Sequence, residues 1–128
     1  MNTQRTVVIT GATGGLGGAV VQRFEQAGDL VIGIARNVPQ DKGWIEADLL
    51  NGQAAEESIR KANERTSRID VLVHVLGGFA GGKPTHETGA DVWEQMVAMN
   101  ATAAFHVIRA TVELMRKQGS GRIIAIGS

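Results

Sequence analysis

A glycine-rich stretch near the N-terminus has the composition and spacing of a phosphate-binding turn. The sequence TVVITGATGGLG, residues 6–17, passes from a short apolar run into Gly11, Gly14, Gly15 and Gly17. Glycines let the backbone approach an anion closely, and the N-terminus of a following helix presents unpaired N–H groups to it. A strand, a glycine turn and a helix in that order predict a pyrophosphate site. The alternative is a glycine-rich turn that binds nothing.

Polar residues follow the apolar runs at the points where ligands of parallel sheets bind. Arg36, Asp48, His74 and Ser128 each stand at or just after the end of such a run. An acidic residue after the second run would suit the ribose of NAD, whereas an arginine accommodates the 2′-phosphate of NADP. Arg36 occupies that place and no carboxylate follows until Asp41, so we predict NADP(H) as the preferred cofactor and NAD(H) as the alternative. Arg36 could instead be a solvated charge or stack on adenine without discriminating.

The elements that position these residues alternate between strand and helix. Apolar, β-branched runs predict strands, and apolar residues at helical spacing predict helices. The predicted strands are residues 6–10, 30–35, 44–47, 69–76 and 121–126, and the predicted helices are residues 16–27, 52–66, 88–99 and 101–117. Asn51 and Thr88 are the predicted N-caps. Only eleven residues separate Arg36 from Asp48, which predicts a loop there.

This alternation predicts the fold class. Strands joined by helices form a parallel sheet covered on both faces, and the crossovers are right-handed. We therefore predict a single α/β domain over residues 1–128, with a three-layer, doubly wound parallel sheet of five strands in the order 3-2-1-4-5. Its ligand is expected at the carboxyl ends of the first and fourth strands, where the order reverses.

The composition argues against several classes of function. The formal net charge of the 128 residues is zero and no basic stripe is present, so neither nucleic acid nor a membrane surface is an expected partner. There is no cysteine and hence no disulfide framework, which suits a cytoplasmic protein. No apolar run approaches the ~20 residues that span a bilayer.

Other short motifs lack a residue that their chemistry needs. Residues 77–83 read G-x-x-x-x-G-K after a strand, but Pro84 follows in place of the hydroxyl residue that binds Mg²⁺. His86-Glu87 has no second histidine four residues further on, so the zinc-protease pattern fails. Ser120 precedes a predicted strand, whereas the serine of a nucleophile elbow follows one. We expect no metal site.

Four motifs in register give the chain a family resemblance. TGATGGLG, Thr10–Gly17, fits the Thr-Gly-x-x-x-Gly-x-Gly cofactor turn of the short-chain dehydrogenase/reductase family, and it also fits the Thr-Gly-x-x-Gly-x-x-Gly turn of the extended branch. Asp48-Leu49, Asn100 and GRIIAIGS, residues 121–128, match later motifs of the ordinary short branch. The chain therefore resembles the N-terminal, Rossmann-like half of such an enzyme.

The resemblance implies a role for each matching residue. Asn100 would join the catalytic proton relay, and Ser128 would orient the substrate carbonyl. Where the family has Asn-Asn-Ala-Gly, this chain has His74-Val75-Leu76-Gly77, which changes the contacts around the nicotinamide. The implied cofactor-binding residues are Thr10, Gly11, Thr13, Gly14, Gly15, Leu16, Gly17, Arg36, Asp48, Leu49 and Gly77.

The chemistry depends on a segment that follows Ser128 in the family. A Tyr-x-x-x-Lys motif should come about a dozen positions later, and its tyrosine protonates the substrate oxygen. This sequence contains no tyrosine, and an unperturbed serine hydroxyl is too weak an acid to replace one. His74 titrates in a suitable range, but on a buried strand a structural role is the commoner one.

We therefore expect a truncated short-chain dehydrogenase/reductase-type oxidoreductase, built for NADP(H)-dependent hydride transfer between carbonyl and alcohol and inactive alone. The alternative is a free-standing nucleotide-binding or oligomeric interaction module without catalysis. In the family the helix at residues 101–117 packs against its counterpart in a neighbouring subunit, so the resemblance implies a homo-oligomer. The sequence gives no substrate.

Overall fold

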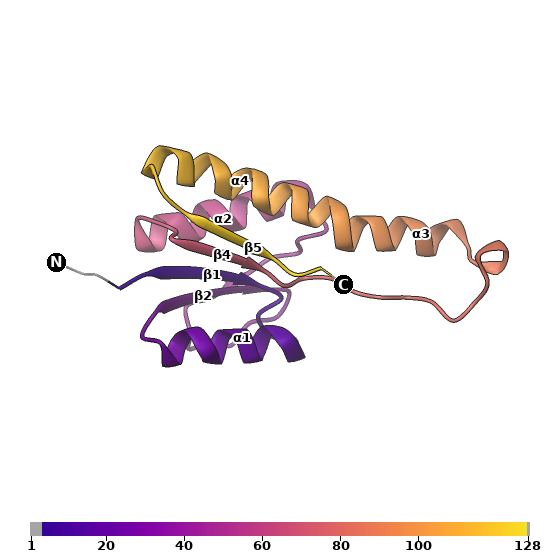
Figure 1. Ribbon diagram of the computed structural model, residues 1–128, viewed down its shortest axis with the longest axis horizontal. Helices are drawn as coiled ribbons and strands as arrows, with labels where there is room; N and C mark the ends of the chain where they lie inside the picture. Colours follow the sequence, from indigo (N-terminus) through magenta and orange to yellow (C-terminus); the bar gives the residue numbers. More distant parts are fainter. Residues whose placement is uncertain (1–3, 128) are drawn as a thin grey trace.

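A parallel sheet of five strands forms the centre of the molecule, in the order β3-β2-β1-β4-β5 (Figure 1). The computed structural model describes residues 4–127. The predicted fold class and strand order are confirmed. The strands are β1 (Thr6–Thr10), β2 (Leu30–Ala35), β3 (Ile45–Glu46), β4 (Val71–His74) and β5 (Arg122–Ala125).

The central strand explains the apolar run at the start of the sequence. All five residues of β1 are buried, because β2 and β4 flank it and helices cover both faces. The register pairs Thr10 with Ile34 of β2 and with His74 of β4. The carboxyl ends of these three strands therefore lie side by side, at the point where the strand order reverses.

Helices form the two outer layers. They are α1 (Gly15–Gln26), α2 (Gly52–Thr66), α3 (Ala90–Val97) and α4 (Ala103–Gln118), with a 3₁₀ turn at Thr85–Glu87 and a π-helical turn at Ala98–Thr102. α1 lies on one face of the sheet, and α2 and α4 lie on the other (Figure 1). The alternation of side chains along each strand divides the core accordingly. Val7 and Ile9 pack with Val21 of α1, whereas Val8 and Leu72 pack with residues of α2 and α4.

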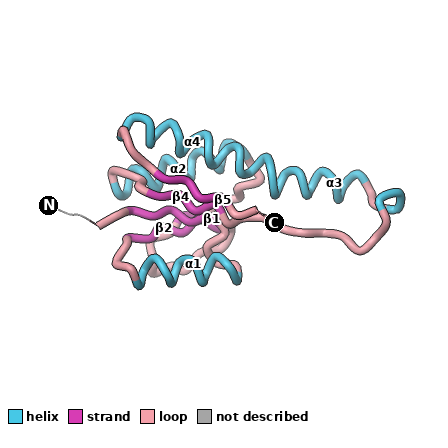
Figure 2. The backbone as a smooth tube through the Cα atoms, in the orientation of Figure 1, coloured by secondary structure: helices cyan, strands magenta, loops and turns pink. Residues whose placement is uncertain are grey.

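Two expectations for the second half of the chain are wrong. Thr88 does not cap α3: the helix begins at Ala90 after Gly89, and the Thr88 hydroxyl donates to the Pro84 carbonyl at 3.0 Å. The predicted break near Asn100 is absent, because the π-helical turn joins α3 to α4 in one long rod (Figure 2). A π turn adds a residue without ending the helix, so the apolar period shifts while the helix continues.

A long exposed loop connects β4 to that rod. It leaves the sheet after His74 and runs along the outside to the far end of α3 (Figure 2). Every residue from Gly77 to Asp91 is exposed, and the ring of Phe79 is 91% exposed. The start of this loop and the π-helical turn approach the carboxyl ends of the strands together.

Candidate functional site

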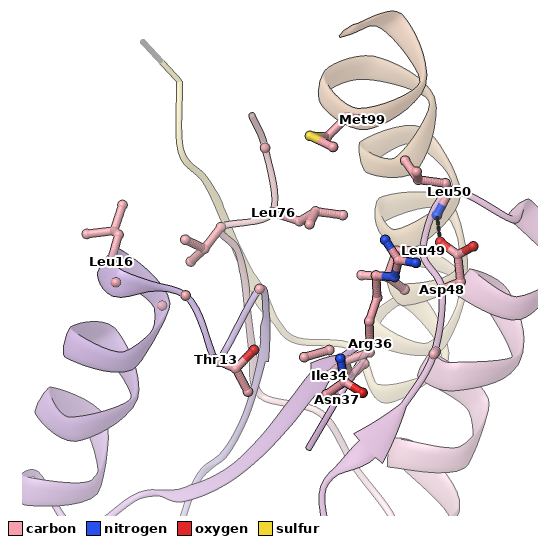
Figure 3. Close-up of a pocket in the computed structure, with 18 residues that line it drawn as sticks. Thr13, Leu16, Ile34, Arg36, Asn37, Asp48, Leu49, Leu50, Leu76 and Met99 are labelled. Atoms are coloured by element: carbon pink, nitrogen blue, oxygen red, sulfur yellow. Dashed lines mark hydrogen bonds between the residues drawn. The ribbon is translucent and has the colours of Figure 1, made fainter. Parts of the chain in front are cut away.

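A cleft of about 410 Å³ opens at the carboxyl ends of β1, β2 and β4 (Figure 3). It lies where the doubly wound topology predicts a ligand. Every predicted cofactor-binding residue except Thr10 lines it, namely Gly11, Thr13, Gly14, Gly15, Leu16, Gly17, Arg36, Asp48, Leu49 and Gly77. Residues scattered over 67 positions of the sequence, from Gly11 to Gly77, thus meet on one surface.

The glycine turn is held by its own backbone. Gly11 has a φ of +63°, a conformation that favours glycine, and its N–H donates to the Ile34 carbonyl at 3.0 Å. The Gly14 N–H donates to the Gly11 carbonyl at 3.2 Å. A Cβ on Gly17 would overlap the Gly11 carbonyl oxygen, so α1 can pack this closely only with glycine there. These bonds fix the direction in which α1 leaves the turn.

The N-terminus of α1 faces the cleft, and no side chain caps its N–H groups or balances its positive end. Gly14 is the N-cap and supplies no side chain, and the first turn of the helix carries no acidic residue. The first N–H groups of any α-helix lack partners within the helix, and the helix dipole makes this end positive. A Cβ built on Gly15 would meet no atom within 4 Å, so the space beside these groups is open. An anionic group fits this cradle, and a side chain at Gly15 would fill it.

The opposite wall of the cleft comes from the ends of β2 and β3. Arg36 and Asn37 follow β2, and Asp48 and Leu49 follow β3 after the predicted loop (Figure 3). The Asp48 carboxylate accepts the Leu50 N–H at 3.0 Å, which holds this turn in place. Within residues 4–127, Arg36 forms no ion pair, so its guanidinium remains available to an anion.

Thr10 lies behind the cleft rather than on its surface. Its side chain is fully buried, and its hydroxyl lies 2.8 Å from Nδ1 of His74. The same oxygen accepts the Val75 N–H at 3.1 Å and the Leu76 N–H at 3.4 Å. Thr10 therefore braces the segment after β4, part of which lines the cleft. Burial lowers the pKa of His74 below its ordinary value.

Asn100 lies in the π-helical turn, with its side chain directed at the loop after β4. Its Oδ1 accepts the Gly78 N–H at 3.0 Å, and its Nδ2 donates to the Gly78 carbonyl at 2.9 Å and to the Met96 carbonyl at 3.0 Å. The side chain thus ties the start of the loop to the helix. The proton-relay role that the resemblance implies for Asn100 stays a prediction. Ser128, the other predicted catalytic residue, lies outside the described residues.

Eight lining residues were not among the predicted cofactor-binding residues, namely Ile34, Ala35, Asn37, Ala47, Leu50, Val75, Leu76 and Met99. Asn37 and Leu50 are neighbours of predicted residues, so the position at a strand end could have identified them. Leu76 lies in the segment that was compared with the family's Asn-Asn-Ala-Gly motif, whereas Met99 comes from the π-helical turn and no motif marks it. No group of three or more His, Asp or Glu side chains placed to hold a metal ion occurs in residues 4–127. Among the same residues, no helix combines the length and apolar character needed to cross a membrane.

Comparison with known proteins identifies the family. A family model for short chain dehydrogenases matches residues 5–128. The chain belongs to the short-chain dehydrogenase family. This confirms the family resemblance of the four sequence motifs.

Two curated relatives of this short-chain dehydrogenase chain show how far the match extends. It is 33% identical over 132 residues to the NADP-dependent 3-hydroxy acid dehydrogenase of Shigella flexneri, covering 95% of this chain and 53% of that protein. It is 28% identical over 143 residues to the acetoacetyl-CoA reductase of an Acinetobacter strain, covering 100% of this chain and 57% of that protein. The chain spans about half the length of the curated relatives it matches.

Solved structures agree on the fold. Serine dehydrogenase from Escherichia coli superposes with a TM-score of 0.86 at 32% identity, over 96% of this chain and 62% of that one. A short-chain dehydrogenase from Streptomyces avermitilis gives a TM-score of 0.88 at 27% identity, over 98% of this chain and 50% of that one.

Proposed function

We propose that the cleft binds NADP(H) and that this chain forms the cofactor half of an oxidoreductase acting on carbonyl or alcohol groups. The observation that carries the proposal is the glycine turn, which presents the uncapped N-terminus of α1 to an open cleft in a short-chain dehydrogenase fold. The pyrophosphate would lie against α1, with Gly14 and Gly15 beside it. The adenosine would lie along Arg36 and Asp48. When bound, the nicotinamide supplies or accepts the hydride.

Arg36 supports the choice of NADP(H) over NAD(H). Its guanidinium is exposed at the end of β2, lines the cleft and has no carboxylate partner in the described chain. A guanidinium offers a planar fork to phosphate oxygens, and an arginine at this position suits the 2′-phosphate. The relative from Shigella flexneri is named NADP-dependent, which agrees with this choice.

Reduction of a carbonyl also needs a proton donor at the oxygen. The 128 residues contain no tyrosine, and the buried His74 binds a proton less readily than an ordinary histidine. We propose that these residues bind and orient the cofactor, and that turnover requires an acid from outside them. The chain on its own is then expected to bind dinucleotide and to turn over little or no substrate.

The test combines binding and turnover measurements on the 128-residue chain. NADPH and NADH affinities are measured by calorimetry, and NADPH oxidation is followed with a panel of carbonyl compounds that includes a 3-oxo acid. Tight NADPH binding with weaker NADH binding and no oxidation supports the proposal. Measurable oxidation would show that a residue of this chain donates the proton, and failure to bind either nucleotide would overturn the proposed function.

A second candidate function is an oligomeric nucleotide-binding module without catalysis. Large apolar side chains are exposed along the rod of α3 and α4, including Trp93 at 70% and Phe105 at 57%. Exposed apolar surface of this kind commonly marks an interface. We propose that the rod joins copies of the chain into a homo-oligomer. Light scattering at high protein concentration tests this. A monomeric mass for the unaltered chain, with the same mass for Phe105→Asp, would contradict the proposal.

A further inference from the structure

The hydrogen bonds of the Thr10 hydroxyl determine which atom accepts its hydrogen. A hydroxyl has one hydrogen to donate and two lone pairs to accept with. The Thr10 oxygen already accepts from two backbone groups, the N–H of Val75 at 3.1 Å and the N–H of Leu76 at 3.4 Å. Its hydrogen is therefore donated in the third contact, to Nδ1 of His74 at 2.8 Å.

This arrangement determines the tautomer of His74. Nδ1 must be the acceptor, so the ring of the neutral histidine carries its hydrogen on Nε2. Nε2 is buried, and no partner for it exists among the described residues. The imidazole is held by a single hydrogen bond, and that bond exists only while Nδ1 is unprotonated.

Among the residues that the structure describes, the surroundings of His74 offer no group that would stabilise a positive charge. His74 shares the sheet face of Leu72, which α2 and α4 cover with Ala55, Ser58, Ile59, Ala62, Ala103, Val107, Thr111 and Met115. β1 carries no titratable side chain, and the only one on β5 is Arg122, opposite Val71 at the other end of β4.

Other titratable groups lie at the edges of this face. On the flank of the two helices, Glu56 pairs with Arg109 at 3.4 Å. His106 lies against Gly52, and its Nδ1 is buried without a partner in the described part of the chain. Asp48, at the end of β3, accepts the Leu50 N–H. His106 is therefore the titratable group that a test must separate from His74.

The braced segment is part of the cleft. Val75 and Leu76 line it together with Gly77. The backbone of Leu76 also abuts the glycine turn, because a Cβ built on Gly11 would lie 3.0 Å from the Leu76 nitrogen. A change in the two hydrogen bonds that the Thr10 oxygen accepts would therefore alter the position of both the Val75–Leu76 segment and the glycine turn.

We propose that His74 is a positioning residue whose neutral imidazole orients the Thr10 hydroxyl to hold the Val75–Leu76 segment, so that protonation of His74 releases this segment and weakens dinucleotide binding. The inference rests on the proposed function, since it concerns the regulation of the same cleft. Protonated histidine is a donor at both nitrogens. Both lone pairs of the Thr10 oxygen already accept backbone N–H groups when Nδ1 of His74 becomes a donor. To accept from Nδ1, the oxygen must lose its hydrogen bond to Val75 or to Leu76.

The direction of the pH dependence follows from burial. Burial disfavours the charged imidazole and lowers the pKa of His74 from its ordinary 6.5. Binding is therefore full at neutral pH and declines as the pH falls below the pKa of His74 in the free protein. If the nucleotide binds only to protein in which His74 is neutral, each pH unit below the pKa of His74 weakens binding by up to about tenfold.

The experiment compares three 128-residue chains: the unaltered protein, His74→Asn and His106→Asn. Asparagine can accept the Thr10 hydrogen through Oδ1 but does not titrate. The dissociation constants of NADPH and NADH are measured at about pH 7.5 and at a series of lower pH values that extends below the midpoint of His74 found by nuclear magnetic resonance. Both nucleotides are used because the 2′-phosphate of NADPH titrates near 6 and NADH carries no such group. We expect NADH binding to weaken by up to about tenfold for each pH unit below that midpoint in the unaltered protein and in His106→Asn, and to stay nearly constant in His74→Asn.

Nuclear magnetic resonance of the unaltered chain provides a readout that needs no variant to fold. The imidazole nitrogens of His74 should show the Nε2–H tautomer at neutral pH, and the amides of Val75 and Leu76 should shift with the same midpoint as the ring. An Nδ1–H tautomer, or amides that do not respond, would overturn the inference. Equal pH dependence in the unaltered chain and His74→Asn would overturn it as well. Absence of NADPH and NADH binding at both pH values is a different result, because it overturns the proposed function and the inference together.

Discussion

Gly15 and Gly18 are three residues apart on α1 and differ in one respect that bears on function. A Cβ on either would meet no atom within 4 Å, but only Gly15 lines the cleft. We expect Gly15→Ala to weaken NADPH binding by about tenfold or more without destabilising the fold, because its methyl group would occupy the space of the pyrophosphate. Gly18→Ala should leave binding unchanged and add up to about 1 kcal/mol of stability. Calorimetry and thermal melts of both variants check this, and equal affinities would contradict the assignment of the turn.

Arg36 gives a second test at the same scale. We expect Arg36→Ala to weaken NADPH binding by about ten- to a hundredfold, since a hydrogen bond to a charged group contributes about 1.5–3 kcal/mol. NADH binding should change little, because NADH has no 2′-phosphate. Arg23→Ala is the matched control, since Arg23 is exposed on α1 and lies outside the cleft. Parallel losses for NADPH and NADH would assign Arg36 to adenine stacking instead.

Single residues were predictable where one local pattern specifies both their conformation and their place. The spacing of Gly11, Gly14, Gly15 and Gly17 located the turn, because Gly11 has a positive φ, a Cβ on Gly17 would overlap the Gly11 carbonyl oxygen, and the space beside Gly15 is open. Thr10 belongs to the same motif, but its partners are 64 to 66 residues away along the chain. Those contacts depend on the pairing of β1 with β4, so only the structure could place the threonine behind the cleft.

At the scale of elements, the N-terminus of α2 differs from that of α1. Asn51 caps α2, and its Oδ1 accepts the Ala54 N–H at 2.9 Å. We expect Asn51→Ala to lower the free energy of unfolding by about 1 kcal/mol, whereas Asn51→Asp should retain the cap. Urea denaturation checks this. A loss as large in Asn51→Asp as in Asn51→Ala would mean that the cap is not what stabilises this end.

The cap of α2 was predictable and the start of α3 was not, for a physical reason. Asn51 stands directly before a helical pattern. Thr88 instead follows a 3₁₀ turn, and its hydroxyl donates to the Pro84 carbonyl of that turn. The π-helical turn was also invisible in the sequence, because an added residue in a helix looks like an interruption of the apolar period. Asn100 stabilises the turn through bonds to Met96 and Gly78, and the second of these is long-range.

The whole molecule should become less stable on acidification, in part through His74. Burial lowers the pKa of His74 in the folded protein below the 6.5 of an unfolded chain, so the unfolded state binds the proton more readily. This contribution to stability is full above about pH 6.5 and is lost as the pH falls through the folded-state pKa. Urea denaturation at several pH values checks it, and the free energy of unfolding should depend less on pH in His74→Asn than in the unaltered chain.

The architecture as a whole was the most predictable level. Alternation of strands and helices leaves few topologies once crossovers are right-handed and the glycine turn follows the first strand. The order β3-β2-β1-β4-β5 follows from those constraints, and the cleft follows from the order. The shape of the cleft walls does not follow, because Leu76 and Met99 reach it through long-range packing and a π-helical turn.

The uncapped start of α1 has an energetic consequence for the empty protein. Unlike α2, this helix has no side chain that neutralises its leading amides, so the ligand-free chain must leave them to water. The first turn should therefore open more often than the core strands, and its amide hydrogens should exchange with deuterium early. Inorganic phosphate or sulfate in the buffer should slow that exchange, which would make the choice of buffer a hidden variable in every affinity measured on this protein.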